Sequence, residues 1–559
     1  MSRTAARPLR RNRDVGPAPA PPRARSGTAD LAGTWTVARL VLRRDRILLP
    51  VWLLVLAGVA ASSAAATVGI YPTAAARREA AEAVNSAPAL VALYGRIWDP
   101  SSLGGVAMLK MTAFGAVLVG VLMLLTVIRH TRGDEEEGRT ELLRAGVVGR
   151  RAPLAAALIL TVGASLLLGL LTALSLVAAG LDARGAWAFG LAWACVGVAF
   201  AAVGAVAAQL TASARAARGI AVGVLAVSFV LRAIGDISSP GGPWWLSWLS
   251  PIGWSQQIRP FGGDRWWVAL IPVAFAALAV ALAVVLLDRR DLGSGLVQPR
   301  PGPSRAGRRL STPLGLAWVL HRASFLAWLS GFAVLALVLG NMASDLGGLL
   351  DSPGARGLIT RMGGVQGLTD AFLSTEIGAG GVVAAAYGVQ AVLRLRVEES
   401  ALRAEPVLAT GVTRSAWFGS HVLVALATSA ALMLGMGLFI GLAHGARTGD
   451  VPGAVVTMVA AGLARVPAVW VVTGLAAAIY GLLPRATVAA WVALVAFLVV
   501  GELGPLLQMP GWALDASPFA HVPSLPGGAV AWAPMVLLLL VAALLLAAGL
   551  AGFRRRDLG

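Results

Sequence analysis

The residues best suited to chemistry in this 559-residue chain lie in two short charged segments. Residues 132–150 read RGDEEEGRTELLRAGVVGR, and residues 396–414 read RVEESALRAEPVLATGVTR. In both segments a glutamate precedes an arginine by four positions, the spacing at which opposite charges support a helix. Acids at the start of a short helix also suit its dipole. These residues predict a helix that presents charge to a partner, with a solvated amphipathic loop as the alternative.

The two segments are related to each other by sequence. Aligned without gaps at an offset of 264, they are identical at seven of nineteen positions. Two further matches occur at nearly the same offset: RRDLG at 289–293 and 555–559, and Ser-Pro at 250–251 and 517–518. Three matches in one order predict an internal repeat rather than convergent composition in basic loops.

Other residues that could do chemistry give weaker signals. The single cysteine, Cys195, lies in an apolar run, and the five histidines are scattered without close pairs. We therefore expect no metal site, and no Ser/His/Asp set or paired carboxylate predicts catalytic residues. A phosphate-binding P-loop needs a lysine directly after a glycine, whereas the only lysine, Lys110, follows a leucine. The sequence predicts that this chain itself holds no ATP or other cofactor.

The composition shows which kind of structure must position the charged segments. Hydrophobic residues make up 57% of the chain and charged residues 13%, about half the charged fraction of a typical soluble protein. So few charges cannot cover a water-facing surface, so the lipid bilayer is the expected solvent. The net charge of +19 does not predict nucleic-acid binding, because the arginines stand between apolar runs, where they act as topology signals.

A membrane-spanning helix needs about 20 mostly apolar residues, and the chain offers twelve such runs. The predicted spans are 48–69, 107–128, 153–180, 186–209, 217–234, 266–287, 325–343, 373–393, 417–442, 453–482, 487–505 and 531–552. The arginine-rich segments fall between alternate spans, all on one side. Since cytoplasmic loops carry the excess of arginine, we expect an all-α protein of the bacterial inner membrane with both termini cytoplasmic.

The repeat and the spans together predict the domain organisation. Residues 1–33 are expected to be a disordered basic tail, and residues 294–313 a cytoplasmic linker rich in Pro, Gly and Arg. Residues 34–293 and 314–559 then form two halves of six helices each. Because six is even, both halves share one orientation, which predicts a parallel repeat with a pseudo-twofold axis along the membrane normal.

Two further segments and two polar residues within predicted spans allow more than one interpretation. Residues 34–52 and 314–328 combine Trp and Arg at roughly helical spacing, which fits a helix in the membrane interface or a cytoplasmic extension of the next span. Arg465 lies within a predicted span and indicates a buried partner, a lining of the transport pathway or a misplaced span boundary. Gln390 is a second possible pathway residue.

This arrangement resembles the type-2 ABC exporter permease. The resemblance lies in an interfacial helix, two spans, a loop of pattern R-x-[DE]-E…R-x-E…A…V-x-R, four more spans and a structured outer loop before the last span. Two such units in one chain resemble the actinobacterial permeases implicated in exporting polyketide antibiotics and other drugs, the tetronasin-resistance type. The resemblance covers residues 34–559 and implies export of a hydrophobic or amphipathic compound.

The resemblance also implies that each loop holds a coupling helix, which sits in a groove of a separate ATPase subunit. Two copies of that ATPase would bind the ATP and Mg²⁺. The residues carried over to ATPase docking are Asp134, Glu135, Arg139, Glu141, Arg150, Glu398, Glu399, Arg403, Glu405 and Arg414. The second loop departs from the first, since Pro406 replaces Leu142 and Leu402 replaces Gly138, so its helix is expected to be shorter or bent.

Four other functions fit parts of the pattern. A secondary transporter also uses twelve spans and parallel repeats, but it normally needs ion or proton sites in the membrane, in which this sequence is poor. An ABC permease that exports lipid would share every feature described. A membrane enzyme such as a lipid-linked transferase would need clustered acids or histidines near an interface. A non-transporting ABC membrane protein would be expected to have a large outer domain.

Overall fold

The computed structural model describes residues 29–146, 148–238, 242–291, 293–297, 307–345, 364–503 and 510–556. Most of the predicted tail, residues 1–28, and the middle of the predicted linker, residues 298–306, lie outside these ranges. The described residues are almost entirely helical, and the isolated bridge between Thr211 and Val297 is their one β-type pairing. The predicted all-α membrane fold is confirmed.

The apolar runs form helices because a backbone in lipid must satisfy its own hydrogen bonds. Eleven helical segments of the described chain are long and apolar enough to cross a membrane. In the first half they are α2 (Leu48–Ile70), the segment Met111–Glu136 that contains α6 (Ala116–Ile128) and α7 (Asp134–Glu136), α9 (Ala152–Ala178), α10 (Ala183–Leu210), α11 (Ala214–Ile237) and the segment Trp266–Asp288 that contains α13 (Leu270–Asp288). In the second half they are α14 (Pro313–Asp345), α16 (Gly364–Ser400), α18 (Arg414–Thr448), α19 (Val451–Ala464) continued by α20 (Val466–Leu482), and α23 (Trp532–Arg555).

Each of the twelve predicted spans coincides with a helix, and one of these helices is described only in part. Residues 487–505 were predicted as the eleventh span, and they contain α21 (Val488–Leu503). Its apolar stretch, Val488–Val500, falls below the length of the other eleven. The chain after α21, residues 504–509, lies outside the described ranges.

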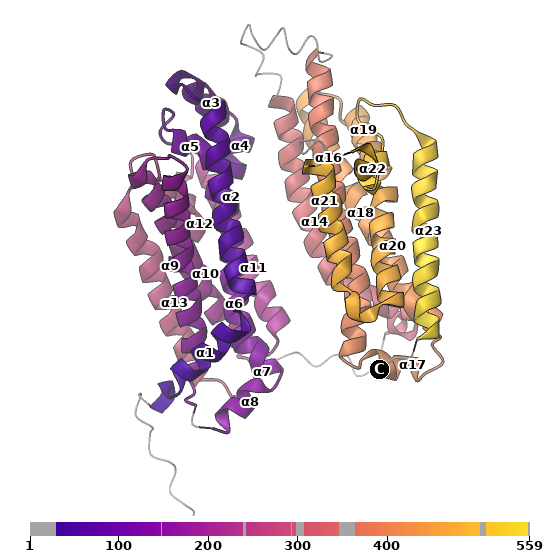
Figure 1. Cartoon of the computed structure of the whole chain (residues 1–559), viewed down its shortest axis with the longest axis horizontal. Helices are drawn as coiled ribbons and strands as arrows, with labels where there is room; N and C mark the ends of the chain where they lie inside the picture. Colours follow the sequence, from indigo (N-terminus) through magenta and orange to yellow (C-terminus); the bar gives the residue numbers. More distant parts are fainter. Residues whose placement is uncertain are drawn as a thin grey trace, which may run out of the picture. The chain divides into compact units, whose positions relative to one another are not determined.

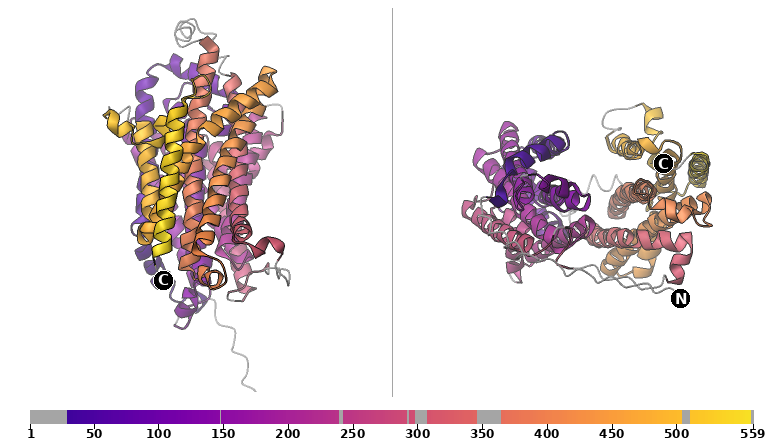
Figure 2. Two further views of the ribbon diagram at one scale, coloured as in Figure 1. Left: turned by 90° about the vertical axis from the view of Figure 1, so that its right-hand side faces the viewer. Right: turned by 90° about the horizontal axis from the view of Figure 1, so that it is seen from below.

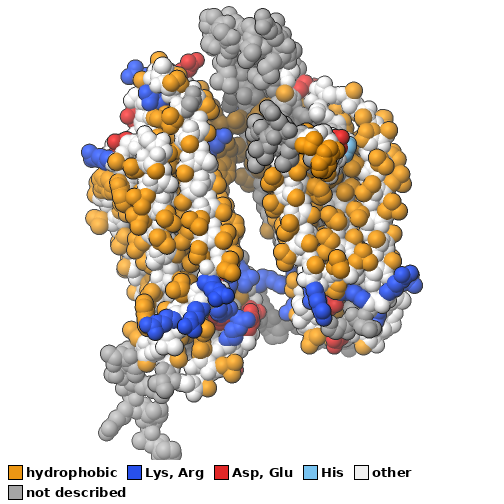
Figure 3. Space-filling view, in the orientation of Figure 1, with side chains coloured by type: hydrophobic (Ala, Val, Ile, Leu, Met, Phe, Trp, Pro, Cys, Tyr) orange, Lys and Arg blue, Asp and Glu red, His pale blue; other side chains and the backbone are white. Residues whose placement is uncertain are grey.

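The chain divides into two compact units, residues 1–82 with 94–300 and residues 83–93 with 301–559. Within each unit the long helices run lengthwise beside one another (Figures 1 and 2). Apolar side chains cover the middle of both units, and arginines gather around the end that carries α7 or, in the other unit, α17 (Ala404–Leu408) (Figure 3). This distribution is typical of a membrane protein whose lipid-facing band is flanked by charge.

Small residues let neighbouring helices approach closely inside the second unit. Along α18, Gly437, Gly441 and Gly445 recur every four residues and face the backbone of α19. A Cβ added at Gly441 would lie 2.6 Å from the Cα of Val455. Membrane helices commonly pack through such a small-xxx-small pattern, because little hydrophobic force is available in lipid to hold them together.

The two segments with alternative readings fold differently from each other. Residues 34–52 break into α1 (Thr34–Arg44) and the start of α2, so α1 is a separate helix. One face of α1 buries Val37, Ala38 and Val41, and Trp35 on its other side is 61% exposed. Residues 314–328, in contrast, are the first turns of the continuous helix α14.

The third sequence match marks corresponding positions in the connections before the last span of each half. Ser250 and Pro251 begin α12 (Pro251–Gln257), and Ser517 and Pro518 begin the 3₁₀ turn η9 (Pro518–His521). Proline suits the first position of a helix, since the amide that it lacks would be unpaired there.

Candidate functional site

The first charged loop continues the helix of the second span and then turns sharply. Met111–Glu136 is one helical segment, and it ends before Gly138, which has a φ of 74°. Glycine adopts this left-handed conformation without steric cost, and it commonly terminates helices for that reason. A second short helix, α8 (Arg139–Arg144), follows. The predicted helical loop is therefore two short helices with a glycine turn between them.

Asp134 is the most heavily paired acid of this loop. Its carboxylate accepts hydrogen bonds from Arg44 of α1 at 2.8 and 2.9 Å and from Arg139 at 2.8 Å. The residue is only 7% exposed. A buried carboxylate is costly unless it is paired in this way, so Asp134 fastens α1 and α8 to the end of the second span.

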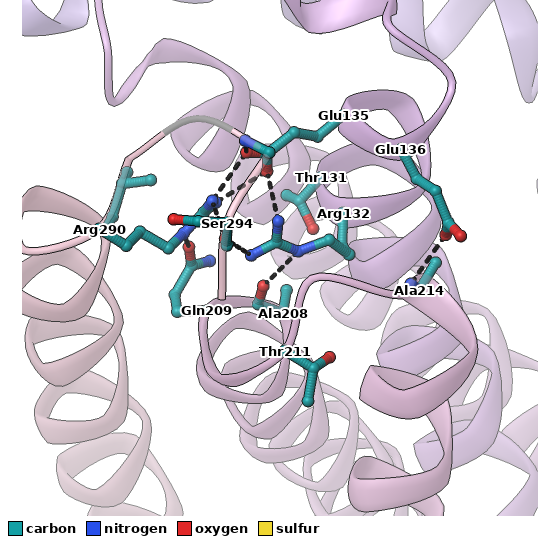
Figure 4. A network of polar contacts seen from close by, with 12 residues as sticks. Thr131, Arg132, Glu135, Glu136, Ala208, Gln209, Thr211, Ala214, Arg290 and Ser294 are labelled. Atoms are coloured by element: carbon teal, nitrogen blue, oxygen red, sulfur yellow. Dashed lines mark hydrogen bonds and ion pairs between the residues drawn. The ribbon is translucent and has the colours of Figure 1, made fainter. Parts of the chain in front are cut away.

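Glu135 points into the unit and binds the arginine of the first RRDLG sequence (Figure 4). Its two oxygens accept hydrogen bonds from Arg290 at 2.7 and 2.8 Å, and the backbone amide of Gly293 donates at 2.7 Å. Arg290 also donates to Gln209 at 2.8 Å. A two-pronged arginine–carboxylate pair is among the strongest polar contacts in proteins.

Arg132 and Glu136 extend this network to the connection between α10 and α11. Arg132 donates to the carbonyls of Ala208 and Ser294 at 2.9 and 3.0 Å and lies 3.2 Å from the carboxylate of Glu135. Glu136 accepts a hydrogen bond of 2.9 Å from the amide of Ala214, the first residue of α11. An acid at a helix N-terminus pairs a free amide and suits the helix dipole.

The second charged loop is built on the same plan. Glu399 accepts a hydrogen bond of 2.7 Å from Arg556, which belongs to the second RRDLG run, and another of 2.9 Å from the hydroxyl of Tyr480. Glu398 pairs with Arg394 at 2.7 Å and with Arg403 at 3.7 Å. Glu398 and Glu399 are 3% and 9% exposed, so both acids are buried.

Arg150 and Arg414, which close the two sequence motifs, also make equivalent contacts. Arg150 donates to the carbonyls of Leu287, at 2.8 Å, and of Arg290. Arg414 donates to the carbonyls of Arg554 and Arg556 at 3.3 and 2.7 Å. In each half the loop is therefore joined twice to the end of the last helix, once through an acid and once through an arginine.

Six of the ten predicted docking residues thus bind within the protein and are not exposed. Asp134, Glu135, Glu398 and Glu399 are held in ion pairs, and the side chains of Arg150 and Arg414 donate to backbone carbonyls. The exposed positions are elsewhere in the loops. They are Glu137, Arg139, Glu141 and Leu142 in the first loop and Leu402, Arg403, Glu405 and Pro406 in the second. Leu142 is 79% exposed, the largest value among the large hydrophobic residues of the described chain.

The second loop keeps the shape of the first despite its substitutions. Leu402 occupies the position of Gly138 and adopts the same left-handed conformation, with a φ of 56°. The helix that follows, α17, has five residues, whereas α8 has six. The expected shortening is therefore one residue, with Pro406 inside α17.

Asp45 forms a further ion cluster that anchors α1 in the first unit. It is 3% exposed and accepts hydrogen bonds from Arg129 and from Nε2 of His130, the latter at 2.7 Å. Burial alone would raise the pKa of Asp45, but the contacts with His130 and Arg129 outweigh burial and lower that pKa below its usual value.

The two possible pathway residues lie in different surroundings. Arg465 sits at the junction of α19 and α20, is 8% exposed, and lines a cavity of about 400 Å³. Arg465 is therefore buried within the continuous apolar segment Val451–Leu482. Gln390 is exposed on α16, where it accepts a hydrogen bond from Trp328 and donates one to Ser324. Gln390 does not belong to the residues that line the cavity.

The chain is 45% identical over 541 residues to the multidrug efflux system permease protein Rv1217c of Mycobacterium tuberculosis. The match covers 96% of this chain and 98% of that protein. The chain belongs to the Rv1217c family of multidrug efflux permeases. Its residues 310–554 also match the family described as multidrug efflux system permease Rv1217c, C-terminal domain. The predicted resemblance to drug-exporting permeases is confirmed.

Sequence reasoning missed the partners that hold the loops of this Rv1217c-family chain. Arg290 and Arg556 were visible as part of the RRDLG repeat, but nothing along the sequence connected them with Glu135 and Glu399. Tyr480 gave no signal, because it lies in an apolar span. A repeated charged sequence directly after an apolar helix was the one available indication that these arginines bind something repeated.

The histidines of this Rv1217c-family chain are closer together in space than they are in the sequence. Nε2 of His321 lies 3.1 Å from Nδ1 of His421, although the two residues are 100 positions apart. Histidines without close neighbours in the sequence thus form a pair in the folded chain. Within the described residues, no group of three or more His, Cys, Asp or Glu side chains could hold a metal ion.

Proposed function

We propose that this chain is the membrane-spanning permease of an ATP-driven exporter. It would move a hydrophobic or amphipathic, drug-like compound out of the cell, and a separate ATPase subunit would supply the energy. The observation that carries the proposal is the 45% identity, over nearly the full length, to a protein described as a multidrug efflux permease. The sequence contains no glycine–lysine P-loop, which supports an ATPase on another chain.

The repeated loops support two docking sites for two copies of that ATPase, which would bind the ATP and Mg²⁺. Each loop exposes a short helix with mixed charge: Arg139, Glu141 and Leu142 in one, and Arg403 and Glu405 in the other. The buried acids serve a second purpose in this proposal. By pairing with Arg290 and Arg556 they fix each loop to the end of the last helix of its half, so a push on the loop moves that helix.

The same loops indicate the orientation of the chain in the membrane, whereas the outward direction of transport is inferred from the likeness to an efflux permease. We place the arginine-rich ends in the cytoplasm and both termini with them, in the inner membrane of a bacterium, because cytoplasmic loops carry the excess of arginine. ATP binding would close the two ATPase subunits, and their motion would rock the two halves about the pseudo-twofold axis. The cargo would leave outward from a site within the membrane.

Exposed residues test docking better than the buried acids do. Replacing Glu135 and Glu399 with lysine would disturb folding as well as docking, because both are buried in ion pairs. We therefore choose Leu142→Asp combined with Glu405→Lys. Leu483→Asp is the matched control, since Leu483 is 60% exposed in the connection between α20 and α21.

The measurement is co-purification of the permease with a co-expressed stand-alone ABC ATPase from the same organism, together with ATP-dependent efflux of a hydrophobic dye from vesicles. The double variant should bind the ATPase at least about tenfold more weakly than wild type does, which corresponds to about 1.4 kcal/mol. The Leu483→Asp variant should bind it with wild-type affinity. Full binding and efflux by the double variant would refute docking through these loops. Efflux that continues after ATP depletion would instead favour a secondary transporter, the alternative that the twelve apolar helices also fit.

A further inference from the structure

A cavity within the second unit contains a buried cation. It is formed by residues of α16, the junction of α19 and α20, α21 and η9, and its volume is about 400 Å³. Arg465 lines it and is 8% exposed. The arginine lies 14 residues after the start of α19, in a helical segment that runs to Leu482. A charge this far inside a membrane helix is costly and marks function.

The guanidinium of Arg465 is only partly satisfied. Its Nη2 donates to the carbonyl and the hydroxyl of Ser374 at 3.1 and 3.3 Å. Its Nε is buried without a hydrogen-bond partner. Among the described residues, no carboxylate lies within ion-pair distance of it, in contrast to the buried arginines of the charged loops. A guanidinium has five N–H donors, so most of them are left for a ligand.

The rest of the cavity is mainly apolar and leaves room at the guanidinium. Phe497, Leu498 and Phe519 form part of its wall. Gly378 of α16 faces the charge, because a Cβ added there would lie 3.6 Å from the guanidinium carbon. An apolar pocket of this size with one well-placed polar group is typical of small-molecule sites.

The first half has no cation at the corresponding place. The repeat offsets of 264 to 266 relate Arg465 to Ala199–Ala201, which are all fully buried. Arg465 therefore does not belong to the framework that the two halves share, whereas the ion pairs of the charged loops do. A group that the duplicated fold does not need is better explained by a ligand.

We propose that the cavity around Arg465 binds an amphipathic anion, with its carboxylate or phosphate on the guanidinium and its apolar body against Phe497 and Phe519. Arginine suits this role, because its planar fork matches both anions with two hydrogen bonds. The inference rests on the proposed export function and deepens it by naming the class of cargo. The same chemistry is offered by an acidic compound and by the headgroup of an anionic lipid.

The test is equilibrium binding to the full chain in nanodiscs of phosphatidylcholine, without ATPase or ATP. The probes are fluorescent dansyl-undecanoic acid and its uncharged methyl ester, with empty nanodiscs as background. Wild-type protein should bind the acid at least about tenfold more tightly than the ester. Equal affinity for the two probes overturns the proposal, and this comparison needs no variant.

Variants then assign the effect to the cavity. Arg465→Gln should abolish the preference for the acid, Arg465→Lys should keep part of it, and Gly378→Leu should weaken acid binding at least tenfold by filling the space. Arg485→Gln removes one arginine from an exposed turn and should change nothing. An unchanged preference for the acid in Arg465→Gln, together with unchanged acid affinity in Gly378→Leu, would refute the assignment.

Two further measurements distinguish an anionic lipid from an acidic compound as the ligand, and the anion-binding proposal from the ATPase-docking proposal. Phosphatidylglycerol that displaces the acid would identify a lipid headgroup as the bound anion, and failure to displace it would favour an acidic compound. Acid binding that survives in the Leu142→Asp, Glu405→Lys variant supports the cavity independently of ATPase docking. Normal docking in a protein without acid preference would leave the exporter proposal standing and remove this one.

Discussion

Glu135 and Arg290 are 155 residues apart in the chain and meet in a two-pronged ion pair with oxygen–nitrogen distances of 2.7 and 2.8 Å. Glu399 and Arg556, 157 residues apart, meet at 2.7 Å in the second half. The repeated acids and the repeated RRDLG sequences are thus two parts of one contact. This explains why both were found at nearly the same offset in the sequence.

Breaking the first pair should destabilise the protein strongly. Glu135→Gln leaves Arg290 buried without its counter-charge, for which we expect a loss of about 3 kcal/mol. Thermal unfolding in detergent measures the effect, with Glu141→Gln at an exposed position as control, for which a change below about 0.5 kcal/mol is expected. A double-mutant cycle with Arg290→Gln should show strong coupling, and additive effects would contradict the pairing.

The left-handed residue in each loop gives a reciprocal pair of substitutions. Leu402→Gly should stabilise the protein by about 0.5–1 kcal/mol. Glycine removes the steric cost of about 1–2 kcal/mol that a Cβ causes in the left-handed conformation, but the greater backbone entropy of glycine in the unfolded chain offsets part of this gain. Gly138→Ala should cost about 1 kcal/mol, since an added Cβ there meets nothing within 4 Å and only the backbone conformation opposes it. Opposite signs in unfolding experiments are the expected result, and a shared sign would contradict it.

The packing of α18 on α19 should depend on the small-residue pattern. Gly441→Ala places a Cβ 2.6 Å from the Cα of Val455, so the helices must separate, at a cost of about 1–3 kcal/mol. Gly419→Ala on the same helix meets no atom within 4 Å and should be neutral or slightly stabilising. Comparing their unfolding temperatures checks the close approach, and equal temperatures would show that it is absent.

The pH dependence of stability should contain a contribution from Asp45. Its pKa is lower in the folded chain than the ordinary value of 3.8, so the folded state favours the charged form. The resulting stabilisation is complete above the ordinary pKa and is lost as the pH falls through the lower, folded value. The stability advantage of wild type over Asp45→Asn should therefore shrink as the pH falls below about 4. An advantage that grows on acidification would contradict the sign.

Much of the fold was predictable, because a membrane span depends on local composition. All twelve apolar runs coincide with helices, and eleven of these helices are long enough in the described chain to cross a membrane. The segments at 34–52 and 314–328 have similar compositions, yet one breaks into two helices and the other continues straight. Tertiary contacts decide this difference, since α1 is held by Arg44 on Asp134 and by its packing on α9.

The candidate site was predictable in position but not in the direction its side chains take. Charge pattern and duplication located both loops correctly, but they could not distinguish Glu135, which points inward, from Glu141, which faces solvent. That distinction depends on Arg290, which is distant in sequence. The same limit applies to His321 and His421, whose contact arises only because α14 and α18 pack together.

The positions of Arg290 and Arg556, each at the end of its half, have a consequence for biogenesis. During synthesis the ribosome takes on the order of ten seconds to proceed from Glu135 to Arg290, and until then the carboxylate of Glu135 must remain hydrated at the membrane surface. Each half becomes electrostatically complete only when its own last helix has been inserted, and neither borrows an arginine from the other.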